Sequence, residues 1–427
     1  MTIKQSPQPM KRIVILVFFL FPMLSRASYL LIPMDEAQKN HLKAYGIAYW
    51  LLKTYNQEVD WLLNYRGGSF AVKYDRNFES ECGIRGISYE VIADGQYTGI
   101  LNEIANPEVN MELVKLEKAP RMAVYSPKAL QPWDDAVTMV LSYAEIPYDV
   151  IYDDEVLDEK LAQYDWLHLH HEDFTGQYGK FYASYSQAQW YKGQVAELEE
   201  IAKRRGFDKV SKLKLAVCKK IKDFVGGGGF MFAMCSATDS YDIALDAEGT
   251  DICDVMYDHD GQSPNAQKEL DFSKGFAFEN YHLHTNPMEY EYSDIDANVG
   301  RQVQKDLDYF NLFDFSAKWD QIPAMLTQCH TKVVKGFMGQ TTAFNKNFIK
   351  KSVLIMGQNK SANEARYVHG EFGKGMWTFY GGHDPEDYQH LVGDPKTDLN
   401  LHPNSPGYRL ILNNVLFPAA KKKKQKT

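Results

Sequence analysis

A cysteine at the end of an apolar run is the first residue in this sequence whose setting suits chemistry. Cys235 follows residues 230–234, Phe-Met-Phe-Ala-Met, and precedes the small residues Ser236 and Ala237. An unbroken apolar run is typical of a strand buried on both faces of a parallel sheet, and ligands lie beyond the carboxyl ends of such strands. A sharp turn there would expose the thiol beside backbone N–H groups, as nucleophilic catalysis requires. We therefore predict that Cys235 is a nucleophile, the alternative being a small apolar core residue.

A histidine stands in a similar position near the end of the chain. His383 follows a second apolar run, residues 376–380, and two glycines, so its ring should lie at the same edge of the sheet. Asp384 and Glu386 are near enough in sequence to orient that ring. A thiol, an imidazole and a carboxylate are the nucleophile, base and orienting group that acyl transfer from an amide requires. The alternative for His383 is a residue that caps a turn through hydrogen bonds.

Polar residues also follow a third expected strand, residues 165–169. We expect them to line the opposite wall of the site and to bind substrate, together with one residue of an aromatic stretch whose rings suit stacking on a sugar or a peptide. These expected substrate-binding residues are His170, His171, Glu172, Asp173 and Tyr178. The alternative for the aromatic stretch is a cover over the edge of the sheet.

The same histidines are potential metal ligands. His168 and His170 project to one face of a strand and could share a metal with a carboxylate from elsewhere, which makes a metallohydrolase a further hypothesis. No spacing of these residues matches a zinc signature, so we favour metal-free packing and expect no metal and no cofactor. Histidines around Cys235 would instead lower the pKa of its thiol.

Short strands that alternate with helices are expected to position these residues. Residues 122–125, 148–152, 165–169, 230–234 and 376–380 read as strands with helical spacing between the first four, which predicts parallel pairing through right-handed crossovers. Near the beginning, residues 29–33 and 59–63 flank a helix and predict another βαβ unit. The predicted fold is a three-layer α/β protein with a mainly parallel, flavodoxin-like sheet, preceded by a smaller N-terminal α/β module.

Changes in composition divide the chain. We predict a small α/β module over residues 28–118 and an amidotransferase-like α/β domain over 119–420. An acidic insertion with little periodicity occupies residues 239–330, and a basic tail occupies 421–427. An irregular insertion of that length is typical of a lid, a substrate-binding segment or a partner surface.

The first 27 residues have the features of a secretory signal peptide. Lys11 and Arg12 precede an apolar run, residues 13–24, and Ser25-Arg26-Ala27 fits a small-x-small cleavage site. The run is too short to span a bilayer, so we expect a periplasmic or secreted protein without a membrane span. An odd number of cysteines in that compartment leaves a free thiol unless one pairs between chains.

The charge balance narrows the expected partners. The chain carries a formal charge of -9, and residues 1–27 contribute only basic side chains, so the processed chain is more acidic still. Such a surface argues against nucleic acid and anionic membranes. We expect a small-molecule, peptide or glycan substrate, and a protein partner through residues 239–330 stays open.

The two segments that carry the candidate catalytic residues also carry a resemblance. The segment 381–386, Gly-Gly-His-Asp-Pro-Glu, and the strand that ends at Cys235 resemble the class I glutamine amidotransferase-like superfamily, especially its trehalose-utilisation-type members, over residues 119–420. The resemblance implies a flavodoxin-like fold and a Cys/His/carboxylate site. Here the elbow is Ala-Met-Cys-Ser-Ala instead of Gly-x-Cys-x-Gly, and Glu386 follows His383 by three positions instead of two.

Taken whole, the chain resembles an exported Bacteroidetes family often labelled asparagine synthetase B. The N-terminal cysteine and the Ser-Gly-Gly-x-Asp-Ser motif of that enzyme are absent from this sequence. The function that we predict is an exported, amidotransferase-like hydrolase of an amide or related bond. The alternative from another class is a non-catalytic module that holds a glycan or a protein on the same fold.

Overall fold

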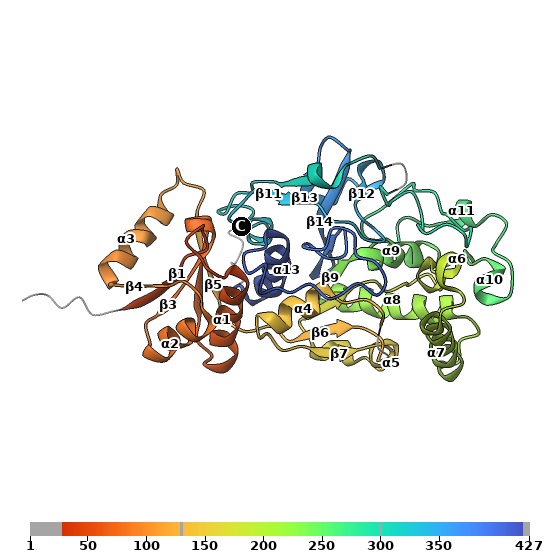
Figure 1. Ribbon diagram of the computed structural model, residues 1–427, viewed down its shortest axis with the longest axis horizontal. Coiled ribbons are helices and arrows are strands. Elements are labelled where there is room, and N and C mark those ends of the chain that lie inside the picture. Colours follow the sequence, from red (N-terminus) through yellow and green to blue (C-terminus); the bar gives the residue numbers. More distant parts are fainter. Residues whose placement is uncertain (1–27, 129–130, 299–300, 422–427) are drawn as a thin grey trace, which may run out of the picture.

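The computed structural model describes residues 28–128, 131–298 and 301–421. The expected signal peptide, residues 1–27, and residues 422–427 of the expected basic tail lie outside the described residues. Figure 1 shows a smaller N-terminal part, coloured red and orange, beside a larger part that contains the rest of the described chain.

The two sheets use strands from the whole chain. The strands are β1 (Tyr29–Ile32), β2 (Val59–Leu63), β3 (Ser69–Lys73), β4 (Glu90–Ile92), β5 (Glu112–Leu116), β6 (Met122–Tyr125), β7 (Asp149–Ile151), β8 (Trp166–Leu169), β9 (Phe230–Met234), β10 (Tyr309–Leu312), β11 (Val333–Lys335), β12 (Phe344–Asn345), β13 (Leu354–Asn359), β14 (Glu364–Phe372) and β15 (Gly375–Tyr380).

The helices connect and cover these strands. They are α1 (His41–Thr54), α2 (Arg76–Arg85), α3 (Asp94–Ala105), α4 (Ala136–Tyr143), α5 (Asp153–Leu157), α6 (Tyr182–Tyr185), α7 (Gln189–Arg205), α8 (Val210–Gly227), α9 (Asp239–Asp246), α10 (Val255–Asp258), α11 (Ala266–Glu269), α12 (Gln321–Leu326) and α13 (Pro406–Leu416).

The N-terminal sheet has the order β4-β1-β3-β2-β5, and all its neighbouring strands are antiparallel. The βαβ unit predicted from β1, α1 and β2 is therefore wrong, because β3 lies between the two strands. The reason is a tight turn after β2, where Gly67 and Gly68 have φ values of 76° and 89°. These values favour glycine, and they reverse the chain into β3 to form a hairpin.

The second sheet is mixed and has the order β11-β10-β13-β14-β15-β9-β8-β6-β7. The strands β7, β6, β8, β9 and β15 are parallel, and β14, β13, β10 and β11 extend the sheet beyond β15 in antiparallel fashion. The hairpin expected around residue 374 is formed by β14 and β15. The fold is thus α/β with a mixed sheet, of which one half is parallel.

Helices bury both faces of the parallel half. Along β9, Phe230, Phe232 and Met234 belong to the core that contains residues of α4 and α13, whereas Met231 and Ala233 belong to the core on the side of α8 and α9. Side chains alternate between the two faces of a strand, so an unbroken apolar run satisfies both cores. This burial explains why β9 was recognisable from sequence.

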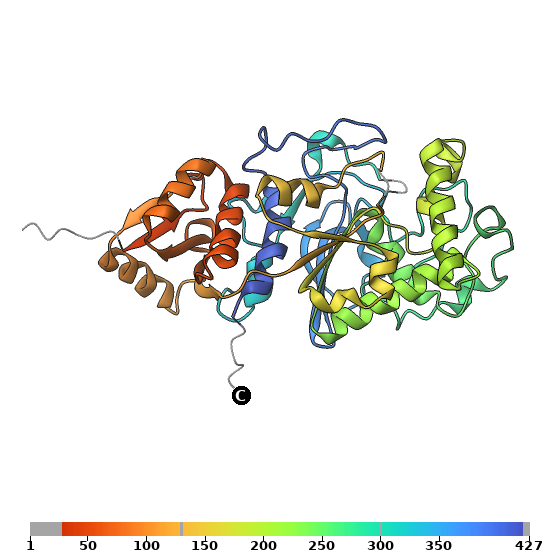
Figure 2. The ribbon, with the colours of Figure 1, turned by 90° about the horizontal axis from the view of Figure 1, so that it is seen from below.

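The C-terminal helix joins the two parts of the molecule. Helix α13 contacts both α1 and α4, and Figures 1 and 2 both show it, in blue, between the N-terminal sheet and the larger part. One continuous apolar core includes residues of β2, α1, α4, α13 and β9. The N-terminal sheet is therefore packed onto the second sheet through a shared core.

The expected irregular insertion, residues 239–330, begins with a regular and fully buried helix, α9. Its acidic residues suggested exposure, but they bind backbone N–H groups of a neighbouring loop. The carboxylate of Asp242 accepts hydrogen bonds from Phe276, Ala277 and Phe278, and that of Asp246 accepts one from Gly275. Buried carboxylates with such donors fold the loop onto the helix. The rest of the insertion consists of short elements and loops, as predicted.

The helices were also compared with the thickness of a bilayer. Within the described ranges, none of them is both long enough and apolar enough to cross a membrane.

Candidate active site

Three parallel strands end at one edge of the second sheet. Strands β8, β9 and β15 pair in parallel, so the residues that follow them leave the sheet together. His170, Cys235 and His383 each come one to three residues after such a strand. One ligand atom from each of these residues and from His171 lies within 4.8 Å of the others. The structure therefore brings the predicted thiol and imidazole together.

Cys235 occupies a strained turn between β9 and α9. Its φ is 54°, in the left-handed region, and it begins a short 3-10 turn, Cys235–Ala237, that leads directly into α9. A non-glycine residue in this conformation costs about 1 to 3 kcal/mol, and such strain clusters at active sites. The backbone N–H of Gln340 donates to the sulfur at 3.4 Å. Strand, strained turn and helix together form the geometry of a nucleophile elbow.

His383 is held by a carboxylate from a distant part of the chain. Its Nε2 lies 3.3 Å from Oδ1 of Asp134, which precedes α4. Asp135, the next residue, is the N-cap of α4 and accepts from the backbone N–H of Thr138. The capped helix thus fixes the loop that carries Asp134. Cys235, His383 and Asp134 stand in the order of nucleophile, base and orienting group.

The electrostatics favour a charged pair. Burial acts to raise the pKa of Cys235, but the hydrogen bond and positive charge of His383, with the N–H groups of Gln340 and Ser236, lower it below the usual value. Burial acts to lower the pKa of His383, yet Asp134 and Cys235 raise it to about 10. The thiol is therefore a thiolate beside an imidazolium at neutral pH.

Other buried thiols provide a contrast. Burial raises the pKa of Cys82 to about 12, and it raises the pKa values of Cys218 and Cys253 well above the usual value. All five cysteines are free and buried. Among these four, only Cys235 combines burial with a lowered pKa, so it is the reactive candidate.

Two more histidines surround the pair. Nδ1 of His171 lies 3.1 Å from Nδ1 of His383, and the ring of His170 stacks on that of His171 with centroids 3.7 Å apart. Burial lowers the pKa of His170 to about 4 and that of His171 well below its usual value, so both rings are neutral. The ring of His390 stacks on His383 from another side, at 4.5 Å.

The structure gives Glu386 and Asp384 other partners than His383, which corrects the predicted orienting group. Glu386 pairs with His402 at 3.1 Å, and Asp384 accepts a hydrogen bond of 2.8 Å from the hydroxyl of Tyr408. Asp384 also accepts from the backbone N–H of Glu386, so the chain turns away directly after His383. Closeness in sequence did not translate into contact, because this turn directs both carboxylates toward other segments.

The expected substrate-binding residues divide into two groups. His170 and His171 lie beside the thiol, whereas the other three have separate partners. Glu172 accepts from the hydroxyl of Tyr152 at 3.3 Å, Asp173 accepts from the backbone N–H of Gly179, and the ring of Tyr178 packs against two other tyrosines. The prediction that Glu172, Asp173 and Tyr178 line the site is not supported by these contacts, because they stabilise the loop after β8.

Sequence reasoning missed Asp134, Gln340 and His390. Asp134 follows the first parallel strand of the second sheet, and an acidic residue at that position could have been identified as an edge residue. Gln340 and His390 lie in irregular segments, where no periodicity indicated their position.

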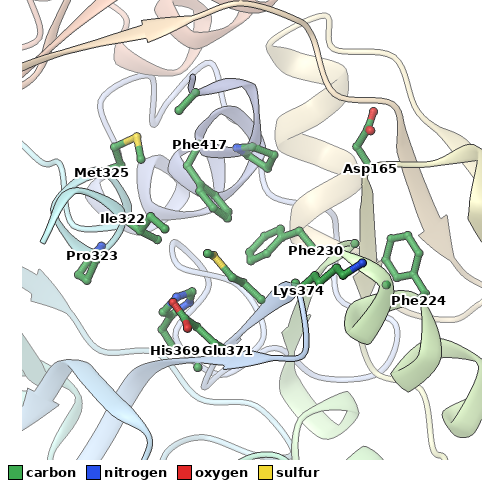
Figure 3. Close-up of a pocket in the computed structure, with 18 of the residues that line it drawn as sticks. Asp165, Phe224, Phe230, Ile322, Pro323, Met325, His369, Glu371, Lys374 and Phe417 are labelled. Carbon is green, nitrogen blue, oxygen red and sulfur yellow. The ribbon is translucent and has the colours of Figure 1, made fainter. Parts of the chain in front are cut away.

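The largest cavity of the described chain lies elsewhere. It has a volume of about 2150 Å³, and Asp165 and Phe230, at the amino ends of β8 and β9, are among its lining residues. Figure 3 shows Phe230, Phe417 and Met325 around its apolar part. Cys235 follows the opposite end of β9, and a strand of five residues is about 16 Å long. The cavity is therefore separate from the cysteine site.

Comparisons with known proteins place the chain in no family. No family model matches it, and no curated protein sequence matches it. Among solved structures, it is similar to a cytoplasmic protein, STM3548, of Salmonella typhimurium, with 10% identity, a TM-score of 0.35 and coverage of 71% of this chain and 100% of the other. For a second cytoplasmic protein of that organism, STM1381, the values are 12%, 0.35, 70% and 99%.

A catalytic mutant of Gan42B, a GH42 β-galactosidase from G. stearothermophilus, matches with 11% identity and a TM-score of 0.25 over 62% of this chain and 28% of the other. These TM-scores support no inference about this chain.

Proposed function

We propose that this protein hydrolyses an amide or related bond, with Cys235 as nucleophile, His383 as acid and base, and Asp134 as the group that orients His383. The observation that carries the proposal is the strained elbow, because it presents a buried thiol to an imidazole that is itself held by a carboxylate. Of the side chains named here, Asp134 replaces the Glu386 or Asp384 expected from sequence.

The chemistry follows the order of the residues. The thiolate of Cys235 attacks the carbonyl carbon of the amide, the C–N bond breaks, and the imidazolium of His383 gives its proton to the leaving amine. The product is a thioester. Water then attacks the thioester while neutral His383 accepts a proton from it, which releases the acid and restores the thiolate and imidazolium.

Two backbone donors would stabilise the oxyanion in both steps. The N–H groups of Ser236 and Gln340 already bind the sulfur. Donors fixed by the backbone need no reorganisation when negative charge develops on a carbonyl oxygen, and losing one such donor typically costs about 2.7 to 4 kcal/mol of transition-state stabilisation. Gln340 is held in turn by its side chain, which donates to the carbonyl oxygen of Gly179 at 2.6 Å.

The fold supports a finer assignment within the same proposal. The parallel strands lie in the order β7-β6-β8-β9-β15. Numbered along the chain, this order is 2-1-3-4-5, which is that of flavodoxin-like sheets. It supports a three-layer, flavodoxin-like fold and membership of the class I glutamine amidotransferase-like superfamily.

The compartment and the substrate class belong to the proposal as well. The signal-like residues 1–27 support export to the periplasm or medium. The acidic chain supports a small-molecule, peptide or glycan substrate rather than nucleic acid.

The rate of alkylation of Cys235 tests the proposal. In protein freed of metal by a chelator, we expect iodoacetamide to label Cys235 rapidly at pH 7, and Cys235→Ser to abolish this labelling. His383→Gln and Asp134→Asn should slow the reaction at least about tenfold, because each tenfold loss of thiolate corresponds to one unit of pKa. A screen for ammonia or amine release from amides then identifies the substrate.

Glu386→Gln is the matched control. It changes a carboxylate of the same loop that contacts His402 instead of His383, so the labelling rate should stay within about twofold, on the order of 0.4 kcal/mol. If Glu386→Gln slowed labelling and Asp134→Asn did not, the assignment of the orienting group would be wrong. Labelling that requires denatured protein would refute the cysteine mechanism and favour a non-catalytic binding module.

A further inference from the structure

We propose that His170, His171, Cys235 and His383 form a binding site for one divalent transition-metal ion of the Zn²⁺ class, and that the bound metal blocks the thiolate. The proposal shares residues with the proposed hydrolase but does not depend on it, since metal binding can be measured without a substrate. It replaces the metal-free packing favoured by sequence, where the spacing of the histidines matched no zinc signature.

The donor atoms have suitable types and spacing. Three imidazoles and a thiolate are ligands that Zn²⁺ prefers, usually in a tetrahedron with bonds of about 2.0 to 2.3 Å. The donors of such a tetrahedron lie about 3.3 to 3.8 Å apart. Here all four donor atoms lie within 4.8 Å of one another, and Nδ1 of His171 is 3.1 Å from Nδ1 of His383. Small movements of the side chains complete the tetrahedron.

Carboxylates support two of the histidines from behind. Oδ2 of Asp135 lies 3.3 Å from Nδ1 of His170, and Oδ1 of Asp134 lies 3.3 Å from Nε2 of His383. Each ring thus has one nitrogen near a carboxylate and the other free to bind a metal. A metal-bound histidine almost always has such a partner on its second nitrogen, which fixes the orientation of the ring and makes it a stronger ligand.

The hydrogen-bonding of His170 is incomplete without a further partner. The residue is 1% exposed, and within the described chain neither ring nitrogen has a hydrogen bond of good geometry, although Asp135 is near. An unpaired buried polar group typically costs about 1 to 3 kcal/mol. A metal on Nε2 supplies the missing interaction in this part of the site, and it also separates the facing nitrogens of His171 and His383.

The local charge also suits a dication. The thiolate of Cys235 and the carboxylates of Asp134 and Asp135 contribute three negative charges around three imidazoles. Once a metal replaces the proton that His383 carries, the three rings are neutral, and a divalent ion balances most of this charge. A site with four protein ligands is closed, so the metal occupies the lone pair with which Cys235 would attack a substrate.

The experiment measures metal first and thiol reactivity second. The full processed chain is stripped with a chelator and titrated with Zn²⁺ against a chromophoric competitor. We expect one ion per chain, and protection of Cys235 from iodoacetamide that excess chelator reverses. With Co²⁺ in place of Zn²⁺, we expect a thiolate-to-cobalt charge-transfer band and the intense visible bands of tetrahedral coordination.

Variants separate the ligands from their surroundings. Cys235→Ser should remove the charge-transfer band, and His171→Gln should weaken Zn²⁺ binding by more than about 100-fold, whereas Asp135→Asn should weaken it by about 10- to 100-fold through His170. His282→Gln is the control, because this histidine is exposed and outside the cluster; its affinity should match wild type. Circular dichroism verifies the folding of each variant.

Two results would overturn the metal site. One is the absence of stoichiometric Zn²⁺ binding to folded wild-type protein, and the other is tight binding that Cys235→Ser and His171→Gln leave unchanged. Rapid alkylation of Cys235 in a protein that binds no Zn²⁺ would reject the metal site and retain the hydrolase. Reversible protection by Zn²⁺ without any amide hydrolysis would do the opposite.

Discussion

Two buried polar clusters lie at the carboxyl edge of the same sheet, and they differ in how completely their groups are paired. In the first, Lys214 of α8 is 1% exposed and donates to both carboxylate oxygens of Asp153, at 3.1 and 3.0 Å. It also donates to the hydroxyls of Tyr125 and Tyr152, at 2.9 and 3.3 Å. The charges neutralise each other, and the ammonium has partners on every side.

The second cluster surrounds Cys235 and is left incomplete. His170 has no hydrogen bond of good geometry among the described residues, two histidine nitrogens face each other, and the cysteine has a strained backbone. Buried polar groups are normally satisfied, so exceptions require an explanation. The difference teaches that the Lys214 cluster stabilises the fold, whereas the Cys235 cluster keeps bonding capacity for a substrate or a metal.

The largest effect is expected from breaking the paired cluster. Lys214→Met leaves the carboxylate of Asp153 buried without its counter-ion, and removing one partner of a buried pair typically costs about 3 to 5 kcal/mol. Urea unfolding should show this loss in the free energy of unfolding. The double variant Lys214→Met/Asp153→Asn should lose less than the single one, because no charge is left unpaired.

Lys212→Met is the matched control on the same helix. Lys212 pairs with Asp208 at the surface, where both side chains are more than half exposed, and such pairs contribute about 0 to 1 kcal/mol. Equal losses for Lys212→Met and Lys214→Met would contradict the stabilising role of the buried cluster.

A smaller effect is expected where two loops of the Cys235 site touch. A Cβ on Gly339 would lie 2.8 Å from the backbone nitrogen of His383, so Gly339→Ala must shift backbone. Overpacking of this kind typically costs about 1 to 3 kcal/mol. We expect Gly339→Ala to slow the alkylation of Cys235 as well, since Gln340 and His383 would move apart from the sulfur.

The control for this variant is Gly193→Ala in α7, where a Cβ meets no atom within 4 Å. Alanine is a better helix former than glycine, so the variant should gain about 0.5 to 1 kcal/mol and alkylate at the wild-type rate. An unchanged alkylation rate in Gly339→Ala would show that the contact between the loops does not position the site.

The smallest effect concerns the pH dependence of stability near the paired cluster. Burial raises the pKa of Glu172 to about 8 from 4.5, although the charge of Lys214 opposes this. Because the folded protein holds this proton more tightly, the stability gained is complete below pH 4.5 and disappears as the pH rises through 8. Chemical unfolding between pH 5 and 9 should therefore show a decline that Glu172→Gln removes.

Glu200→Gln, on the exposed face of α7, is the control for that measurement, and its profile should follow the wild type. A wild-type decline that persists in Glu172→Gln would assign the pH dependence to another group.

The sequence by itself determined the local structure of the parallel half and two residues of the site. The apolar run before Cys235 predicted β9, because a strand between two cores requires apolar side chains on both faces. Its position at a strand end also predicted the meeting of Cys235 with His383. The antiparallel N-terminal sheet was predicted wrongly, because the hairpin after β2 depends on a glycine turn instead of a periodic pattern.

Only the tertiary structure decided what surrounds the thiol. Asp134 is 249 positions from His383, and Gln340 is 105 positions from Cys235, so no local spacing could pair them. The nearer carboxylates, Asp384 and Glu386, were the expected partners from sequence, but a turn directs them to other residues. The physical reason is that hydrophobic periodicity specifies strands and helices, whereas the contacts between their ends depend on how loops pack after the sheet has formed.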